Sequence, residues 1–560
     1  MQTFTTTASS SVLDVESRNL LALDDSVGGG SIVASALAYS TDPTTHFLHS
    51  ATPVDLPDGR RCSDLSLHDL DQATQSWSAW YLDRGVRPRD RVAVFIADSF
   101  AYSIHFYALA QIGAIAVLIN SNASAQVAGS LLEQTEPVGL YADPEHLARL
   151  AEVPGSLWVV TSEQVRAPAP ATLADEHRYK HVGEDPVVIL HSSGTTGRPK
   201  PTIHTHASIV AGPKFRLVDH REDPHATTMT ALPQSHLGCI AFTTYSVLAG
   251  APLVALRDCP GPVLAESIDR YRPTAVMSFA HAYSELAATT IEPGTLDSVG
   301  TWISIGDAVH EAHIRRVLDM RSPSLPAATF LDRLGTTELG WGVLLQTHTT
   351  GAGVAARSAG RPVGVAEVQV LRADGTPAAP HEPGFLGARG PAITPGYWAN
   401  SAVTYSSRLA GYWLTGDVAV CDEGGNYYLI DRVVDAIDTR DAVGYSVAME
   451  EALLGGLPEI EEVAVVAGRY DSRTVAVAMI KPSPGEHDPD LLVRRVNEVL
   501  VRNAHPPIAF VELIDAHDDL PTGVTGKVLK RQLRERYATL PVLPDARLIA
   551  ADPLLVPMAG

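Results

Sequence analysis

The sequence predicts an α/β fold built around a largely parallel sheet. Apolar residues recur at helical spacing from Ser66 to Leu82, and strand-like and helix-like runs alternate after them. This alternation is typical of parallel sheets covered by helices. The short run from Pro186 to Leu190 gives a second indication, because its β-branched residues suit a buried strand. The 560 residues are also enough for one large core and a second domain.

The individual elements follow from turn residues and apolar runs. Gly85 and Pro88 end the first helical pattern, and a second helix is expected from Ser99 to Gly113. The strands that we expect are 92–96, 114–119, 186–190, 274–279 and 302–305. Residues 1–30 are rich in Ser and Thr and end in three glycines, which predicts a flexible N-terminal arm.

Composition and charge exclude several classes of protein. Lys and Arg number 42 against 64 Asp and Glu, so the net charge is −22 and we expect neither nucleic acid nor an anionic membrane as a partner. The four cysteines form no CxxC pair and predict reduced thiols in a cytoplasmic protein. The most apolar stretch, 108–119, is too short to span a bilayer, and we see no signal peptide.

The run 186–190 leads into a loop whose composition suits phosphate binding. Small residues let backbone N–H groups converge on an anion, hydroxyls add donors, and a lysine adds positive charge. The loop lacks the Gly-Lys-Ser/Thr ending of a Walker motif. An ordinary turn is the alternative, but the strand before the loop and the basic residues behind it favour a phosphate site. The residues expected there are Ser192, Ser193, Gly194, Thr195, Thr196, Gly197 and Lys200.

This loop closely resembles the phosphate loop of the adenylate-forming superfamily, which includes acyl- and aryl-CoA ligases, peptide-synthetase adenylation domains and luciferases. Other motifs similar to those of the family follow in its order downstream. The resemblance implies a large N-terminal AMP-binding domain at 31–431, with stacked mixed and parallel sheets, helices and a β-rich subdomain. It also implies a small mobile α+β C-terminal domain at 432–540, followed by an extension at 541–560.

The segment from Leu334 to Glu338 resembles the family's Tyr-Gly-x-Thr-Glu motif. The resemblance implies that Gly335 and Thr336 belong to the nucleotide site and that Thr337 bonds the α-phosphate. It implies that Glu338 holds Mg²⁺, for which a carboxylate oxygen is a suitable hard ligand. Leu334 stands where the family has an aromatic residue that stacks on adenine. By itself the segment would predict only the start of a helix.

Four later residues match the remaining motifs of the family. The resemblance implies that Asp417 accepts the ribose hydroxyls and that Arg432 reaches ribose or phosphate. Asp435 takes the place of the hinge between the two domains. Lys527, in a Gly-Lys motif near the C-terminus, is expected to bridge the substrate carboxylate and the α-phosphate and to neutralise charge as pyrophosphate leaves.

The resemblance also implies an acyl pocket near the reacting carboxylate. Its residues are His236, Phe279, His281, Gly306 and Asp307. A helix-capping or core histidine is the alternative for His236. His204 and His206 are spaced for metal binding, but without a third ligand we favour a structural or pocket-lining role. We expect an aryl or medium-sized acyl acid as substrate rather than a long fatty acid.

The predicted function is ATP-dependent activation of a carboxylic acid as acyl-AMP, with release of pyrophosphate and transfer to the thiol of CoA or of a carrier protein. Asp441 replaces a glycine of the loop that lines the thiol tunnel in thioester-forming members of the family. That change favours an alternative, an amide or N-acyl ligase with an amine acceptor. A catalytically inactive nucleotide-binding protein is a third reading, which Lys527 argues against. We expect a monomer or homodimer that uses ATP and Mg²⁺.

Overall fold

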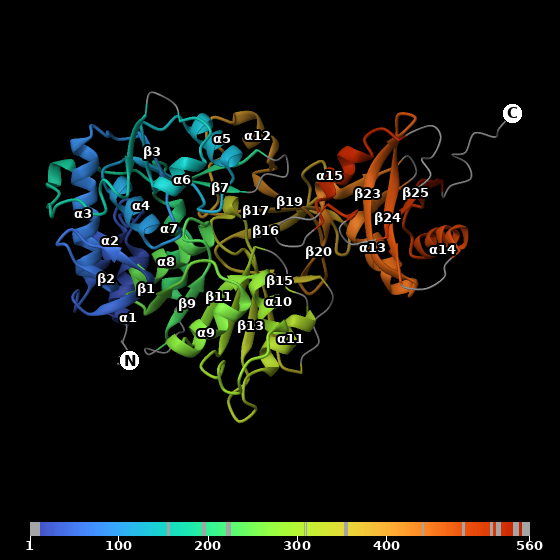
Figure 1. Ribbon diagram of the computed structural model, residues 1–560, viewed down its shortest axis with the longest axis horizontal. Helices are drawn as coiled ribbons and strands as arrows, with labels where there is room; N and C mark the ends of the chain where they lie inside the picture. Colours follow the sequence, from blue (N-terminus) through green and yellow to red (C-terminus); the bar gives the residue numbers. More distant parts are fainter. Residues whose placement is uncertain are drawn as a thin grey trace. The chain divides into compact units, whose positions relative to one another are not determined.

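The computed structural model describes residues 12–550 except 154–156, 193–197, 220–225, 307–308, 310, 352–356, 440–441, 484–487, 516–518, 522–527 and 541–547. The chain forms two compact units (Figure 1). The first consists of Met1–Gln369 and Gly387–Thr415, and the second of Val370–Leu386 and Gly416–Gly560. This division falls before the predicted domain boundary at 431/432.

The first unit contains a six-stranded sheet in the order β6-β5-β3-β4-β7-β8. Its strands are β3 Arg91–Phe95, β4 Ile115–Leu118, β5 Gly139–Ala142, β6 Trp158–Thr161, β7 Pro186–Ser192 and β8 Lys200–Thr205. All neighbours are parallel except β7 and β8. The predicted α/β class and the strands expected at 92–96, 114–119 and 186–190 are confirmed.

The same unit contains a second row of strands in the order β15-β14-β13-β12-β11-β9-β10-β1-β2. Their bounds are β1 His46–Asp55, β2 Arg61–Ser66, β9 Thr228–Ala231, β10 Leu253–Ala255, β11 Ala275–Phe279, β12 Thr301–Ile305, β13 Thr329–Leu334, β14 Leu344–Thr349 and β15 Ser358–Pro362. From β1 to β13 the neighbouring strands are parallel. Their carboxyl ends therefore meet at one edge.

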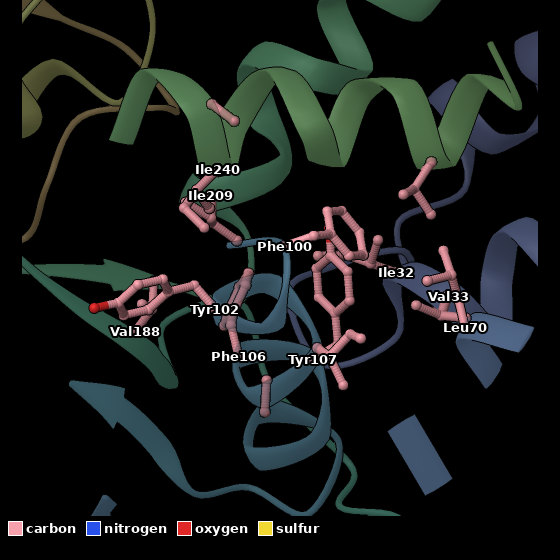
Figure 2. Close-up of a cluster of buried hydrophobic side chains, with 14 of the residues drawn as sticks. Ile32, Val33, Leu70, Phe100, Tyr102, Phe106, Tyr107, Val188, Ile209 and Ile240 are labelled. Atoms are coloured by element: carbon pink, nitrogen blue, oxygen red, sulfur yellow. The ribbon is translucent and has the colours of Figure 1, made fainter. Parts of the chain in front are cut away.

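Helices of the first unit bury apolar side chains against these sheets. Tyr102, Phe106 and Tyr107 of α4 lie in one cluster with Val188 and Ile240 (Figure 2). Burying each of such side chains stabilises the fold by roughly 1.5–3 kcal/mol. The helices are α1 Val15–Leu23, α2 Ile32–Tyr39, α3 Leu67–Asp83, α4 Ala101–Gln111, α5 Ala125–Thr135, α6 Pro144–Arg149, α7 Ser208–Val218, α8 Leu237–Ala249, α9 Gly261–Tyr271, α10 Ala280–Ala288, α11 Glu311–Asp319 and α12 Ser401–Ser406.

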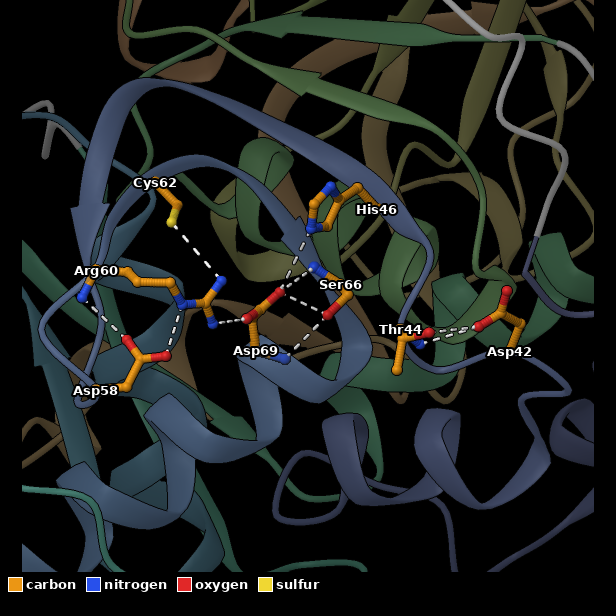
Figure 3. A network of polar contacts seen from close by, with 8 residues as sticks. All are labelled: Asp42, Thr44, His46, Asp58, Arg60, Cys62, Ser66 and Asp69. Atoms are coloured by element: carbon orange, nitrogen blue, oxygen red, sulfur yellow. Dashed lines mark hydrogen bonds and ion pairs between the residues drawn. The ribbon is translucent and has the colours of Figure 1, made fainter.

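A polar network fixes the start of α3 (Figure 3). The Ser66 side chain accepts the backbone N–H of Asp69, while the Asp69 carboxylate accepts the backbone N–H of Ser66. Arg60 lies between the carboxylates of Asp58 and Asp69 and donates to both. This capping box satisfies two N–H groups that the helix itself leaves unpaired.

The flexible arm predicted for residues 1–30 is wrong over residues 12–30, and residues 1–11 lie outside the described part of the chain. Leu13 and Leu21 are buried. Gly28 packs closely against the His206 ring and Gly30 against the His181 ring. A Cβ added to them would come within 2.1 Å and 2.3 Å of these rings. The glycines are close-packing positions, which local composition did not reveal.

The second unit is α+β, as predicted. Its main sheet has the order β23-β24-β25-β26, in which β24 and β25 are parallel. The bounds are β21 Ala436–Asp438, β22 Val443–Tyr445, β23 Ile460–Tyr470, β24 Arg473–Pro482, β25 Ile508–Leu513, β26 Leu548–Ala550, α13 Ser446–Gly456, α14 Pro489–Arg502 and α15 Lys530–Arg536.

Strands with the order β16-β17-β19-β20 include the points where the chain passes between the units. They are β16 Glu367–Leu371, β17 Gly384–Arg389, β19 Tyr412–Cys421 and β20 Tyr427–Arg432, and the short β18 Arg408–Leu409 pairs with β19. Among the described residues, no helix combines the length and the apolar character needed to cross a membrane.

Candidate active site

Loops at the carboxyl ends of both sheets of the first unit contact one another. Within the six-stranded sheet, the backbone N–H of Asn120, after β4, donates to Nε2 of His191 in β7 at 3.0 Å. The Asp98 carboxylate, after β3, accepts the backbone N–H groups of Gln234 (2.7 Å) and Asp258 (3.0 Å), after β9 and β10. Ligands of open α/β sheets bind at the carboxyl ends of the strands, where these loops lie.

Two segments expected to bind ATP come together at Tyr397, which was itself given no role in the site. Its hydroxyl donates to Oε1 of Glu338 at 2.8 Å. The Lys200 ammonium lies 5.3 Å from the centre of the Tyr397 ring, within the range of a cation–π contact. The backbone N–H of Trp398 donates to the carbonyl of Pro201 at 2.8 Å, which ties this segment to β8.

His204 of β8 is buried and has a structural contact. Its Nε2 lies 2.8 Å from the carbonyl oxygen of Thr337 and holds the Thr-Thr-Glu segment against β8. Burial lowers the pKa of His204 to about 4, so the ring is neutral at pH 7. Within the described residues, no group of three or more His, Cys, Asp and Glu side chains could hold a metal ion. The structural role favoured for His204 agrees with both observations.

The Glu338 carboxylate suits the Mg²⁺ role implied by the resemblance. A carboxylate has two acceptor oxygens, and the Tyr397 hydroxyl donates to Oε1 of Glu338. Thr337 and Glu338 begin a 3₁₀ helix, Thr337–Leu339, and both are buried. The hydroxyl oxygen of Thr336 is buried with no partner in the part of the chain that the structure describes. Gly335 closely approaches the Trp341 carbonyl and Gly342, where an added Cβ would lie at 3.2 Å.

Four of the expected acyl-pocket residues, His236, Phe279, His281 and Gly306, lie next to one another after β9, β11 and β12. His236 caps α8 by accepting the backbone N–H of Gly238, which is the capping alternative, while its place in an acyl pocket stays a prediction. Its ring lies edge-on to Phe279, with centroids 5.1 Å apart, and Phe279 lies 5.9 Å from His281. Burial and then the nearby His191 lower the pKa of His236 to about 4. Gly306 has φ +87°, and an added Cβ would lie 3.1 Å from the Phe279 ring.

Sequence reasoning missed three residues of this region, Asp98, Asp258 and Tyr397. Burial raises the pKa of Asp98 to about 6, although two backbone N–H groups favour its charged form. Oδ1 of Asp258 lies 3.8 Å from Nε2 of His281. The position of both aspartates shortly after an apolar strand was the available signal, since polar groups at strand carboxyl ends often serve a site.

In the second unit, Asp417 and Arg432 are cross-strand neighbours in β19 and β20. Nη1 of Arg432 donates to Oδ1 of Asp417 at 2.8 Å, and the Asp417 carboxylate is almost fully buried. The predicted hinge residue Asp435 forms an ion pair with Arg534 of the same unit. The pairing of Asp417 with Arg432 presents a carboxylate and a guanidinium together, which suits hydroxyl and phosphate groups.

Several predicted site residues lie outside the described residues. They are Ser193, Gly194, Thr195, Thr196, Gly197, Asp307 and Lys527. The backbone of Ser192 is described, as the last residue of β7.

Comparison with known proteins gives a consistent result. The sequence model of the family described as AMP-binding enzyme matches residues 50–398. The chain is 34% identical over 550 residues to 3-aminoavenalumate diazotase of Streptomyces sp, covering 93% of this chain and 98% of that protein. It is 29% identical over 464 residues to feruloyl-CoA synthase of Amycolatopsis sp, covering 81% and 90%. ATP-bound MatB from Rhodopseudomonas palustris has the same fold, with TM-score 0.73, 19% identity, and coverage of 91% and 99%.

Proposed function

Because the chain belongs to the AMP-binding enzyme family, we propose that it activates a small aryl or medium-sized carboxylic acid with ATP and passes the acyl group to a thiol. The predicted superfamily and the class of AMP-forming ligase are confirmed at the level of the family. In the first step, a carboxylate oxygen attacks the α-phosphorus, the bond to pyrophosphate breaks, and acyl-AMP forms. The thiol sulfur then attacks the acyl carbon and AMP leaves.

The convergence of Lys200, Tyr397 and Glu338 is the observation that supports this function best. The Lys200 ammonium, at the end of the phosphate loop, and the buried Glu338 carboxylate both contact the side chain of Tyr397. Lys200 would stabilise the negative charge of the phosphates, and Glu338 would hold the Mg²⁺ that neutralises the leaving pyrophosphate. Thr337, Asp417 and Arg432 would position the α-phosphate and ribose. Lys527 would bridge the carboxylate and the α-phosphate.

Pyrophosphate release tests this proposal. The full chain would be given ATP, Mg²⁺ and a panel of aryl and acyl acids, each alone, with CoA, and with simple amines. We expect release that needs an acid and rises with CoA, with the thioester identified by mass spectrometry. Lys527→Ala should lose adenylation but keep ATP affinity, with Lys180→Ala, at an exposed lysine, as the control. An unchanged rate in Lys527→Ala would contradict the assigned role, and absence of release in the wild type would favour the nucleotide-binding alternative.

A second candidate function has an amine as acceptor. The sequence identities to the two relatives favour this function. The diazotase matches more of the chain at higher identity than the feruloyl-CoA synthase does. Diazotisation of an aromatic amine needs a nitrogen donor at the oxidation level of nitrite. A nitrite oxygen would attack the α-phosphorus in place of a carboxylate oxygen, displacing pyrophosphate and giving a nitrosyl adenylate.

The remaining steps balance without a further oxidant. The amine lone pair attacks the nitrosyl nitrogen, the N–O bond to AMP breaks, and the nitrogen loses a proton. The resulting N-nitroso amine takes up a proton and loses water to give the diazonium ion. With ATP, nitrite and an aminocinnamic acid, this function predicts pyrophosphate, AMP and a diazonium ion that couples to a naphthol dye. Pyrophosphate release that is indifferent to nitrite would exclude it.

The finer properties of the enzyme are part of the same proposal. CoA, a carrier protein and an amine are all proposed acceptors, and Mg²⁺ is the proposed metal. The cytoplasmic location and the monomer or homodimer state stay predictions.

A further inference from the structure

We propose that His281 and Asp258 recognise an amino group on an aromatic substrate whose ring lies against Phe279. This inference rests on the proposed function, because it assumes that the substrate acid binds with its carboxylate beside His236. It adds which residues would contact an amino substituent, which neither the family nor the motifs specify. The two residues act in recognition, with His281 contacting the amino group and Asp258 fixing the orientation of His281.

The spacing of the rings carries the first step. His236, Phe279 and His281 follow one another with centroid distances of 5.1 and 5.9 Å. Aromatic rings pack at centroid separations of this size. A substrate whose reacting group lies at His236 would therefore bring its ring to Phe279. A substituent on the far side of that ring would then reach His281.

The polar atoms at the end of this row carry the second step. Oδ1 of Asp258 is buried and has no hydrogen-bond partner among the described residues. Its distance of 3.8 Å from Nε2 of His281 is too long for a hydrogen bond but short enough for electrostatic attraction. The carboxylate favours the imidazole tautomer with its proton on Nε2, which leaves Nδ1 as an acceptor. The side chains are 31% and 24% exposed, so the pair is accessible to a ligand.

The surrounding charges favour an amino group over an anionic substituent. The carboxylates of Glu285 and Asp98 both interact with that of Asp258, so in the described part of the chain three acidic groups lie here against one nearby cation, Arg257, which acts on Asp98. Negative charge repels a carboxylate or phenolate and attracts the partial positive charge of N–H groups. An amino group also supplies the donors that Nδ1 of His281 needs, whereas an unsubstituted ring supplies none.

The loop that carries Asp258 is fixed before any ligand binds. The backbone N–H of Asp258 donates to Oδ2 of Asp98 at 3.0 Å. The backbone N–H of Gln234 donates to Oδ1 of Asp98 at 2.7 Å. Preorganised polar groups discriminate well between ligands, because a ligand that lacks the matching group leaves them unpaired. The arrangement thus suits selection of an amino-substituted ring over the same ring without the amino group.

Binding, measured without turnover, tests the inference separately from the proposed function. Titration calorimetry would compare 3- and 4-aminocinnamate with cinnamate on the full chain, in the presence of an α,β-methylene ATP analogue and Mg²⁺. We expect at least one aminocinnamate to bind about tenfold tighter than cinnamate, the value of one hydrogen bond. Equal binding of all three, or no binding of any, would overturn the inference.

Variants of His281 and Asp258 test whether these two residues cause the preference for aminocinnamate over cinnamate. His281→Phe should abolish the tenfold preference while leaving cinnamate affinity within about threefold, because the ring is kept and the acceptor is lost. His281→Gln, which retains an acceptor, should restore part of the preference, and Asp258→Asn should reduce it. His177→Phe, at an exposed histidine, is the matched control. A preference that persists in His281→Phe would refute the assignment. Failure of pyrophosphate release alone would count only against the proposed function.

Discussion

Replacing Tyr397 with Phe removes the hydroxyl that holds Glu338 while keeping the ring beneath Lys200. The phenol donates to a buried carboxylate at 2.8 Å. Burial, followed by the charge of Glu338, raises the pKa of Tyr397, so the phenol keeps its proton and remains a donor. A hydrogen bond to a charged group contributes about 1.5–3 kcal/mol. Since each 1.4 kcal/mol is tenfold, kcat/KM for ATP should fall about tenfold to a hundredfold.

The assay is ATP-dependent pyrophosphate release at saturating acid and Mg²⁺, with ATP varied. Tyr397→Leu also removes the cation–π contact with Lys200 and should lose a further factor of about 2–5. Tyr405→Phe is the control, because Tyr405 is 76% exposed on α12 and should behave as the wild type. The role given to this hydrogen bond would be refuted if Tyr397→Phe had the same free energy of unfolding as the wild type and a kcat/KM within twofold of it.

Two further predictions concern stability. The raised pKa of Asp98, about 6 against 3.8, means that its ionisation disfavours the folded state. Its contribution to the free energy of unfolding is therefore largest below pH 4 and decreases by up to about 3 kcal/mol as the pH rises to 6. Denaturant titrations from pH 4 to 7 should show a weaker fall in Asp98→Asn, and an unchanged slope would contradict the assignment. Gly30→Ala should lower the free energy of unfolding by about 1–3 kcal/mol through overlap with the His181 ring. Gly129→Ala, inside α5 with open space around its Cα, should raise it by about 0.5–1 kcal/mol, and equal effects of the two would show that packing at Gly30 is loose.

The elements that local patterns specify could be predicted from the sequence. The strand predicted at 274–279 is observed as Ala275–Phe279, and the helix predicted from Ser99 to Gly113 as Ala101–Gln111. The parallel arrangement followed from their alternation. The order of the motifs also identified the family, because each motif is a short contiguous segment.

The rest depended on contacts between segments far apart in the chain. Tyr397 contacts Glu338 and Lys200, and the residues next to it in the sequence give no indication of these contacts. The arm prediction was wrong for a similar reason, since Gly28 and Gly30 are required by the rings of His206 and His181, which lie about 180 and about 150 residues further along the chain. Composition reports average flexibility, whereas the need for glycine arose from a single packing partner.

Asp98 links the loops after β9 and β10 through one carboxylate, and this has a consequence for how the enzyme can diversify. The hydrogen bonds reach only backbone N–H groups, so the side chains on either loop can be exchanged without breaking them. Selection can therefore alter substrate preference at these loops one substitution at a time while the backbone that presents them is inherited unchanged. A substitution at Asp98, by contrast, would change the backbone position of both loops at once. We therefore expect Asp98 to vary less than the side chains of the two loops among relatives with different substrates.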